Sequence, residues 1–148
     1  MPKMNTIGVL AKSAGVKVTT IRYYEGIGLL PSPSRTVSDR RLYDDADARR
    51  LSFIRHARDL GFPIEAIRSL LDLSSHPDLP CDAADRIAAE QLSSVEGKIA
   101  QLESLRLELA RITKACKGGT VGKCSVIEAL ADHALCQTQH RTPGGRAS

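Results

Sequence analysis

The sequence predicts a mostly α-helical protein: a helix-turn-helix with a small wing, then one long helix and a short C-terminal loop. Of the 148 residues, 42% are apolar, only 3% are aromatic and none is Trp. The core is therefore built mainly from Leu, Ile, Val and Ala, a composition that suits helices better than aromatic-rich strands. Two short helical patterns adjoin near the N-terminus, and a much longer pattern with heptad spacing occupies the second half.

The first two helices are predicted from their end signals. Thr6 is a suitable N-cap for the first helix, and Gly15 is a suitable C-terminal stop. The second helix is expected to begin at Thr19 or Thr20. Two short helices joined by residues 14–16 indicate a helix-turn-helix, although many αα-hairpins share this pattern.

A wing and two further helices are predicted next. The polar residues 32–43, rich in turn formers, suit a small hairpin. A third helix begins at Asp45 and stops at Gly61, with Leu51, Ile54 and Leu60 facing inward. Pro63 then starts a fourth helix, which has Ile64, Ile67, Leu70 and Leu71 on one face.

One long helix is predicted from about Pro80 to Ala115, after a linker over residues 74–80. About 36 residues of helix span about 54 Å, which four short helices cannot cover. We therefore expect a second copy of the chain to supply a partner helix, with packing inside one chain as the alternative. The apolar stripe follows steps of three and four residues: Leu92, Val95, Ile99, Leu102, Leu105, Leu109 and Ile112.

Charge is distributed unevenly along the chain. Residues 1–60 carry eleven Lys/Arg against six Asp/Glu, whereas residues 61–115 carry six against nine. Positive charge at the N-terminal end indicates where a polyanion would dock, with a solvated basic face as the alternative. No apolar run is long enough to span a membrane, and the N-terminus lacks a signal-peptide stretch, so we expect a cytoplasmic protein with no membrane partner.

A series of short motifs in fixed order resembles the MerR family of transcription regulators, and the similarity extends to about residue 131. In one place the chain departs from the family pattern: Asp39-Arg40 stands where the wing usually carries a Gly-Tyr pair. The motifs are Ile7-Gly8-Val9-Leu10-Ala11, Thr20-Ile21-Arg22-Tyr23-Tyr24-Glu25, Gly28-Leu29-Leu30-Pro31, Arg41-Leu42-Tyr43, Leu51-Ser52-Phe53-Ile54, Leu60-Gly61-Phe62 and Ile67-Arg68-Ser69-Leu70-Leu71.

The resemblance implies a winged helix-turn-helix homodimer joined by an antiparallel coiled coil. It also implies binding to double-stranded promoter DNA whose core elements are spaced too far apart for RNA polymerase. Effector binding would make the dimer bend and untwist the DNA, which activates transcription and involves polymerase only indirectly.

The candidate DNA contacts lie in the second helix and the wing. Arg22 can reach a base edge or a phosphate in the major groove. Tyr23 and Tyr24 can offer hydroxyls to phosphates, with core packing as the alternative for one of them. The expected contacts to the DNA backbone are Thr20, Arg40 and Arg41.

Three cysteines form the candidate metal site. Cys116 and Cys124 enclose a seven-residue loop with three glycines, and two thiolates make a good clamp for a soft ion; buried free cysteines are the alternative. Cys81 lies 35 residues before Cys116, about 52 Å along a helix, so the two cannot share an ion in one chain. In an antiparallel pair, Cys81 of one subunit meets Cys116 and Cys124 of the other. This spacing matches the family's three-cysteine sensors of divalent metals.

Several ions fit such a site. Three thiolates suit Hg(II) or Pb(II), whereas Zn(II) or Cd(II) would need a fourth ligand from His133, Cys136, His76 or water. A His in a polar tail is more often simply solvated. The Cys-x7-Cys loop is also similar to the family's Cu(I) sensors, but those lack a thiol at the Cys81 position, so Cu(I) ranks second.

The predicted function is a metal-responsive transcriptional regulator. A redox sensor with a disulfide between Cys116 and Cys124 is the main rival. A multidrug sensor is disfavoured because about 24 residues after Cys124 cannot form a ligand domain, and no catalytic arrangement suggests an enzyme. The expected domains are a winged helix-turn-helix over 1–74, a dimerisation helix over 75–115, a metal-binding loop and short helix over 116–132, and a flexible tail over 133–148.

Overall fold

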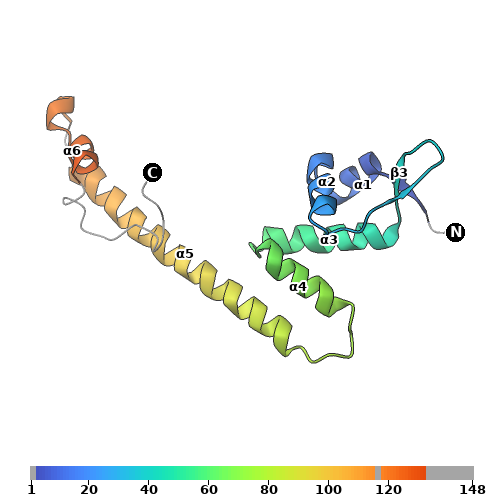
Figure 1. The fold of residues 1–148 in the computed structure, drawn as a ribbon. Helices are drawn as coiled ribbons and strands as arrows, with labels where there is room; N and C mark the ends of the chain where they lie inside the picture. The colour runs from blue at the N-terminus through green and yellow to red at the C-terminus, as the bar shows by residue number, and fades with distance from the viewer. Residues whose placement is uncertain (1–2, 116–117, 133–148) are drawn as a thin grey trace. The chain divides into compact units, whose positions relative to one another are not determined.

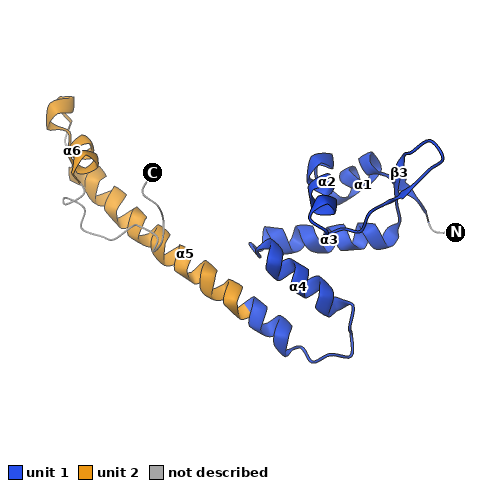
Figure 2. Cartoon of the chain, viewed as in Figure 1, with its two compact units in different colours: residues 1–88 blue, residues 89–148 orange. Residues whose placement is uncertain are grey.

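The computed structural model describes residues 3–115 and 118–132, and the chain divides into two units, residues 1–88 and 89–148 (Figures 1 and 2). In chain order the elements are β1 (Asn5–Thr6), α1 (Ile7–Ala14), α2 (Val18–Gly26), β2 (Ser34–Arg35), β3 (Arg41–Tyr43), α3 (Asp45–Asp59), α4 (Ile64–Ser74), α5 (Asp82–Ala115), a 3₁₀ turn η1 (Val121–Lys123) and α6 (Ser125–Ala131).

The ends of α1 are set by the two residues that the sequence indicated. The Thr6 hydroxyl accepts a hydrogen bond from the amide of Val9 at 3.4 Å. Gly15 closes the helix in the left-handed region, with φ of 66°. The next helix, α2, begins at Val18, slightly before the predicted start, because Lys17 already has the extended backbone of an N-cap.

The wing is part of a three-stranded antiparallel sheet in the order β1-β3-β2. β3 pairs with β2 as predicted, and Arg35 lies opposite Arg41. β1, whose Asn5 lies opposite Tyr43, was not predicted from the sequence. Asn5 and Thr6 are therefore tied to the wing.

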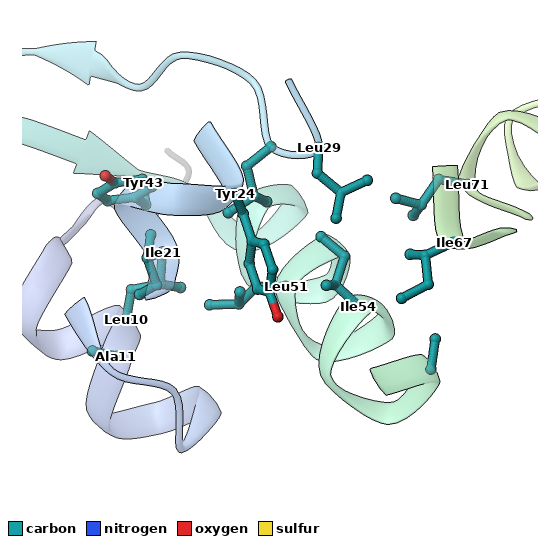
Figure 3. Packing of buried hydrophobic residues seen from close by; sticks show 12 residues of the cluster. Leu10, Ala11, Ile21, Tyr24, Leu29, Tyr43, Leu51, Ile54, Ile67 and Leu71 are labelled. Carbon is teal, nitrogen blue, oxygen red and sulfur yellow. The ribbon is translucent and has the colours of Figure 1, made fainter. Parts of the chain in front are cut away.

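The core of the first unit brings side chains from α1, α2, β3, α3 and α4 together (Figure 3). Leu51, Ile54 and Ile67 are fully buried, as the helical periodicity predicted. Leu60 is predicted to face inward, but it is 67% exposed. It lies six residues after Ile54, and a rotation of about 100° per residue turns it about 120° away from the buried side of α3. The buried cluster is Leu10, Ala11, Ile21, Tyr24, Leu29, Leu30, Tyr43, Leu51, Ile54, Ala57, Ile67 and Leu71.

Three arginines of α3 and α4 donate to backbone carbonyls at the ends of the first two helices or, for Leu29, just beyond the end of α2. The last carbonyls of a helix have no partner inside it, so a cationic donor stabilises them. The bonds run from Arg55 Nη1 to the Ala14 oxygen at 2.6 Å, from Arg50 Nε to the Leu29 oxygen at 2.7 Å, and from Arg68 Nη2 to the Ile27 oxygen at 2.9 Å.

The helix α5 has 34 residues, close to the predicted bounds, and runs from the first unit into the second. Its predicted apolar stripe lies largely open in the single chain: Leu92, Ile99, Leu102 and Leu109 are each more than half exposed. Within the described residues, no helix combines the length and apolar character that a membrane crossing requires.

Candidate nucleic-acid interface and metal-ligating cysteines

The helix α2 has one buried side and one exposed side. Ile21 and Tyr24 point into the core, whereas Arg22 is exposed and Tyr23 is 56% exposed. Thr20 is half-buried. Core packing was left open for one tyrosine, and Tyr24 is the one whose side chain is buried (Figure 3). The outer side therefore offers a guanidinium and a phenol hydroxyl next to each other.

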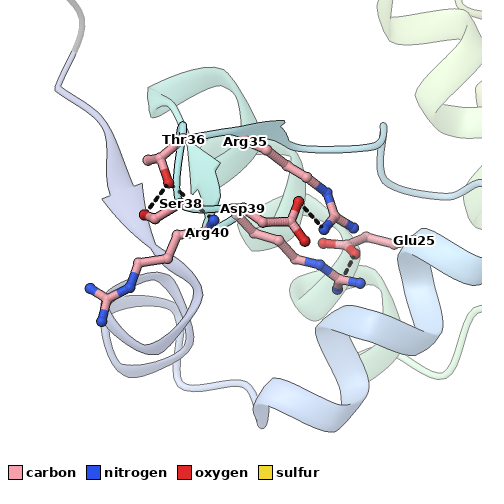
Figure 4. Close-up of polar contacts among 7 residues, drawn as sticks. Glu25, Arg35, Thr36, Ser38, Asp39 and Arg40 are labelled. Atoms are coloured by element: carbon pink, nitrogen blue, oxygen red, sulfur yellow. Dashed lines mark hydrogen bonds and ion pairs between the residues drawn. The ribbon is translucent and has the colours of Figure 1, made fainter.

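Two of the three arginines of the wing are each held by a carboxylate (Figure 4). Arg41 Nη1 lies 3.0 Å from Glu25 Oε2, and Arg35 Nη1 lies 2.9 Å from Asp39 Oδ1. Like charges directly opposite each other on two strands repel, and the two carboxylates offset that repulsion. Arg35 was not predicted from the sequence as a residue of this site, because only its pairing with Arg41 across the two strands places it here.

Glu25 connects α2 to the wing. Its side chain is only 10% exposed, and its second oxygen accepts a hydrogen bond from the Tyr43 hydroxyl. Burial, together with that hydrogen bond to a carboxylate, raises the pKa of Tyr43 to about 12. Glu25 therefore holds two side chains of β3.

The tip of the wing explains the unusual Asp39-Arg40 pair. Asp39 has φ of 64°, a left-handed conformation in which glycine is preferred and Asp is among the better-tolerated alternatives. The amide of Arg40 donates to the Thr36 hydroxyl at 3.0 Å, and the Thr36 amide donates to the Arg40 carbonyl at 2.8 Å. The Arg40 side chain is exposed and leads away from Glu25 (Figure 4).

A pocket of about 330 Å³ lies where the wing meets the start of α1. Two of its lining residues are Arg40 and Arg41, and the others are Thr6, Ile7 and Gly8. Arginine is a residue type suited to binding an anion such as a phosphate of a nucleic-acid backbone.

The described cysteines flank α5. Cys81 directly precedes the helix and is exposed, and its thiol donates to Asp85 Oδ1 at 3.5 Å. That hydrogen bond and the charge of Asp85 raise the pKa of the Cys81 thiol. Cys124 is half-buried and directly precedes α6.

Two of the three glycines in the loop before Cys124 have a backbone conformation that favours glycine. Gly118 and Gly119 have φ of 81° and 105°, which side-chain-bearing residues rarely adopt. His76 and Cys81 line one pocket of about 340 Å³ between α4 and the start of α5. The other proposed ligands, Cys116, His133 and Cys136, lie outside the described residues.

Comparisons with known proteins identify the family. The family described as "MerR HTH family regulatory protein" matches residues 5–74, and the family described as "MerR, DNA binding" matches residues 48–112. The chain belongs to the MerR family of transcription regulators. The resemblance found in the sequence is confirmed, and as a MerR-family regulator the chain is not an enzyme.

Individual MerR-family proteins match most of the chain. The HTH-type transcriptional regulator ZntR of Escherichia coli K12 is 44% identical over 130 residues, covering 86% of this chain and 92% of its own. The mercuric resistance operon regulatory protein of Serratia marcescens is 38% identical over 127 residues, covering 84% and 86%.

A solved MerR-family structure supports the fold. The transcription regulator PbrR691 from Ralstonia metallidurans CH34, in complex with lead(II), has a TM-score of 0.74 and 35% identity, covering 85% of this chain and 98% of its own. The predicted fold, a winged helix-turn-helix followed by a long helix, is thereby confirmed.

Proposed function

We propose that this MerR-family chain is a metal-responsive regulator that binds promoter DNA as a homodimer and distorts the operator when a thiophilic ion binds. One observation carries the metal part: an exposed thiol, Cys81, directly precedes the 34-residue helix α5, and Cys124 lies just beyond its far end. The names of the relatives support it, since one belongs to a mercuric resistance operon and another was solved with lead(II).

The DNA-reading surface is proposed to combine α2 and the wing, within a DNA-binding domain over residues 1–74. Arg22 and Tyr23 are exposed on α2, and Arg40 and Arg41 line the pocket at the start of α1. Arg22 would reach base edges, while the wing arginines would contact phosphates. Tyr24 would act by packing beneath this surface, and Thr20 would contact the DNA backbone.

The dimer is proposed to form along α5. This helix makes up most of the proposed dimerisation region, residues 75–115. Exposed apolar side chains at heptad positions are stabilised when a second helix covers them. A homodimer of antiparallel α5 helices would bury Ile99 near its centre and Leu92 and Leu109 on either side. RNA polymerase would respond to the distorted promoter rather than bind this chain.

The metal site is proposed to form in trans, from Cys81 of one chain and Cys116 and Cys124 of the other. The second chain would contribute its two cysteines from a metal-binding loop and short helix over residues 116–132. The donor set fits a thiophilic ion, because thiolates are soft ligands and Cys81 is accessible. Zn, Cd, Pb and Hg are the candidates, with His133 or Cys136 as further ligands for Zn or Cd. When bound, the ion supplies a cross-link between the two subunits.

A mixed dimer tests the site. One chain carries Cys81→Ser, and the other carries Cys116→Ser and Cys124→Ser. In trans, one of the two sites keeps all three thiols, so titration should find one tight site per dimer. The matched control pairs an unchanged chain with a chain carrying all three changes, and in trans it keeps no complete site. The opposite pattern, no site in the first dimer and one in the control, would show that sites form in cis.

In vitro transcription then separates the effectors. A panel of Zn, Cd, Pb, Hg, Cu(I) and Ag, under reducing conditions, should activate through a divalent ion. Activation by Cu(I) alone would favour the two-thiolate alternative. Activation by oxidant without metal would favour the disulfide of a redox sensor. In both cases the DNA-binding part of the proposal stands.

A further inference from the structure

We infer that Glu25 is a positioning residue, which holds the wing residue Arg41 for a DNA phosphate and joins α2 and the wing into one DNA-binding surface. The inference rests on the proposed DNA contact of Arg41. It is carried by the contacts of the Glu25 carboxylate, because both of its oxygens bond to side chains of β3.

The contact joins segments far apart in the sequence. Glu25 Oε2 accepts from Arg41 Nη1 at 3.0 Å, across 16 residues of chain, and Tyr43 donates to the other oxygen across 18. Tyr43 is 1% exposed, so its hydroxyl is a fixed anchor for the carboxylate. Figure 4 shows Glu25 on α2 directed toward the wing.

The geometry also places the wing beside the exposed part of α2. Arg22 lies three residues before Glu25, and residues three apart are neighbours on a helix surface. Glu25 thus draws the Arg41 guanidinium toward the helix face that carries Arg22. One wing cation and one helix cation are held close together.

An acidic group near DNA calls for a physical reason, since a carboxylate repels the phosphates and by its charge alone weakens binding. Arg41 offers five N–H donors, and the bond to Glu25 leaves others available for a phosphate. Its side chain is 32% exposed, which allows such a contact. Holding a long side chain in place before binding lowers the entropy lost on binding.

The test compares Glu25→Ala with a matched control, Asp39→Asn. Both changes remove one negative charge from the DNA-binding half, and Asn also tolerates the left-handed backbone of Asp39. Asp39 pairs with Arg35 at an exposed position, 78% exposed on the Asp side, where such pairs contribute little. Charge alone predicts tighter DNA binding in both variants. If Glu25 positions Arg41, E25A should bind DNA about ten-fold more weakly, the loss expected for one charge-assisted hydrogen bond. D39N should then bind DNA no more weakly than the parent.

The Arg41→Ala background separates positioning from a general loss of stability. R41A is expected to weaken binding of the full-length dimer and to lower the salt dependence by about one unit. Adding E25A to R41A should then strengthen binding slightly, because only the repulsive charge is lost. A structural role would weaken binding in both backgrounds.

A second variant keeps the test valid if E25A does not fold, as judged by circular dichroism. Glu25→Asp keeps the charge but shortens the side chain, so positioning predicts weaker binding, and charge alone predicts no change. If R41A has no effect on binding, the proposed wing contact and this inference both fail. If R41A weakens binding while E25A and E25D bind as tightly as the parent, only this inference fails.

Discussion

Replacing Tyr43 by Phe removes one buried hydroxyl and tests how much the link between the wing and α2 contributes to stability. The hydroxyl donates to the Glu25 carboxylate, and the residue is 1% exposed. Losing a hydrogen bond to a charged group costs about 1.5–3 kcal/mol. Burial and this hydrogen bond together raise the pKa of Tyr43 from 10.0 to about 12, so ionisation of the hydroxyl is disfavoured in the folded protein.

The pH dependence gives this prediction its sign. Between about pH 10 and pH 12 the unfolded chain releases the Tyr43 proton while the folded protein still holds it. The stability contributed by this group is therefore complete below about pH 9 and is lost as the pH rises. By pH 11 about 1.4 kcal/mol of it should be gone.

The assay is urea unfolding followed by circular dichroism at pH 7, 9 and 11, at one fixed protein concentration because the stability of the proposed dimer would depend on it. Subtracting the Y43F curve from the parent curve removes the titration of lysines and of the other tyrosines. The difference should be about 1.5–3 kcal/mol at pH 7 and should shrink at pH 11. A difference that is equally large at pH 7 and pH 11 would refute the assigned role of the hydroxyl.

Three further changes test the fold and the proposed dimer. Gly15→Ala should lower the melting temperature by several degrees, because the added Cβ would lie 2.4 Å from Arg55 Nη1 at a φ of 66°; an unchanged melting temperature would contradict the close approach. Arg68→Ala should lower the free energy of unfolding measured in urea by about 1–3 kcal/mol, since it removes the donor to the Ile27 carbonyl, and an unchanged free energy of unfolding would show that this bond adds no stability. Leu102→Asp should convert the dimer to monomer in sedimentation at micromolar protein, because it places a charge on the seam; a dimer that persists would mean that the seam lies elsewhere.

The sequence predicted those parts of the fold that depend on local signals. A threonine at an N-cap and a glycine in the left-handed conformation act over three or four residues, so the ends of α1 could be predicted from Thr6 and Gly15. The starts of α3 and α4, at Asp45 and Ile64, also follow from residues directly beside them.

The parts that escaped prediction depend on contacts between distant segments. β1 has only two residues and becomes a strand because Tyr43 and Leu42 lie beside it. Likewise, the pairing of Glu25 with Arg41 requires the wing to fold back onto α2. Periodicity also could not decide between Tyr23 and Tyr24, because neighbouring positions of a helix differ by about 100° and either could face the core.

The order of strands in the wing sheet has a consequence for how the domain forms. β2 and β3 lie within ten residues of each other and can close as a hairpin, whereas Asn5 must wait for Tyr43, 38 residues later. Closing a longer loop costs more chain entropy, and contacts of large sequence separation slow folding. We expect β1 to join last as the polypeptide folds and to open first in the native state. Its amide hydrogens should exchange with deuterated water well before those of Ile21 or Ile54 in the helices.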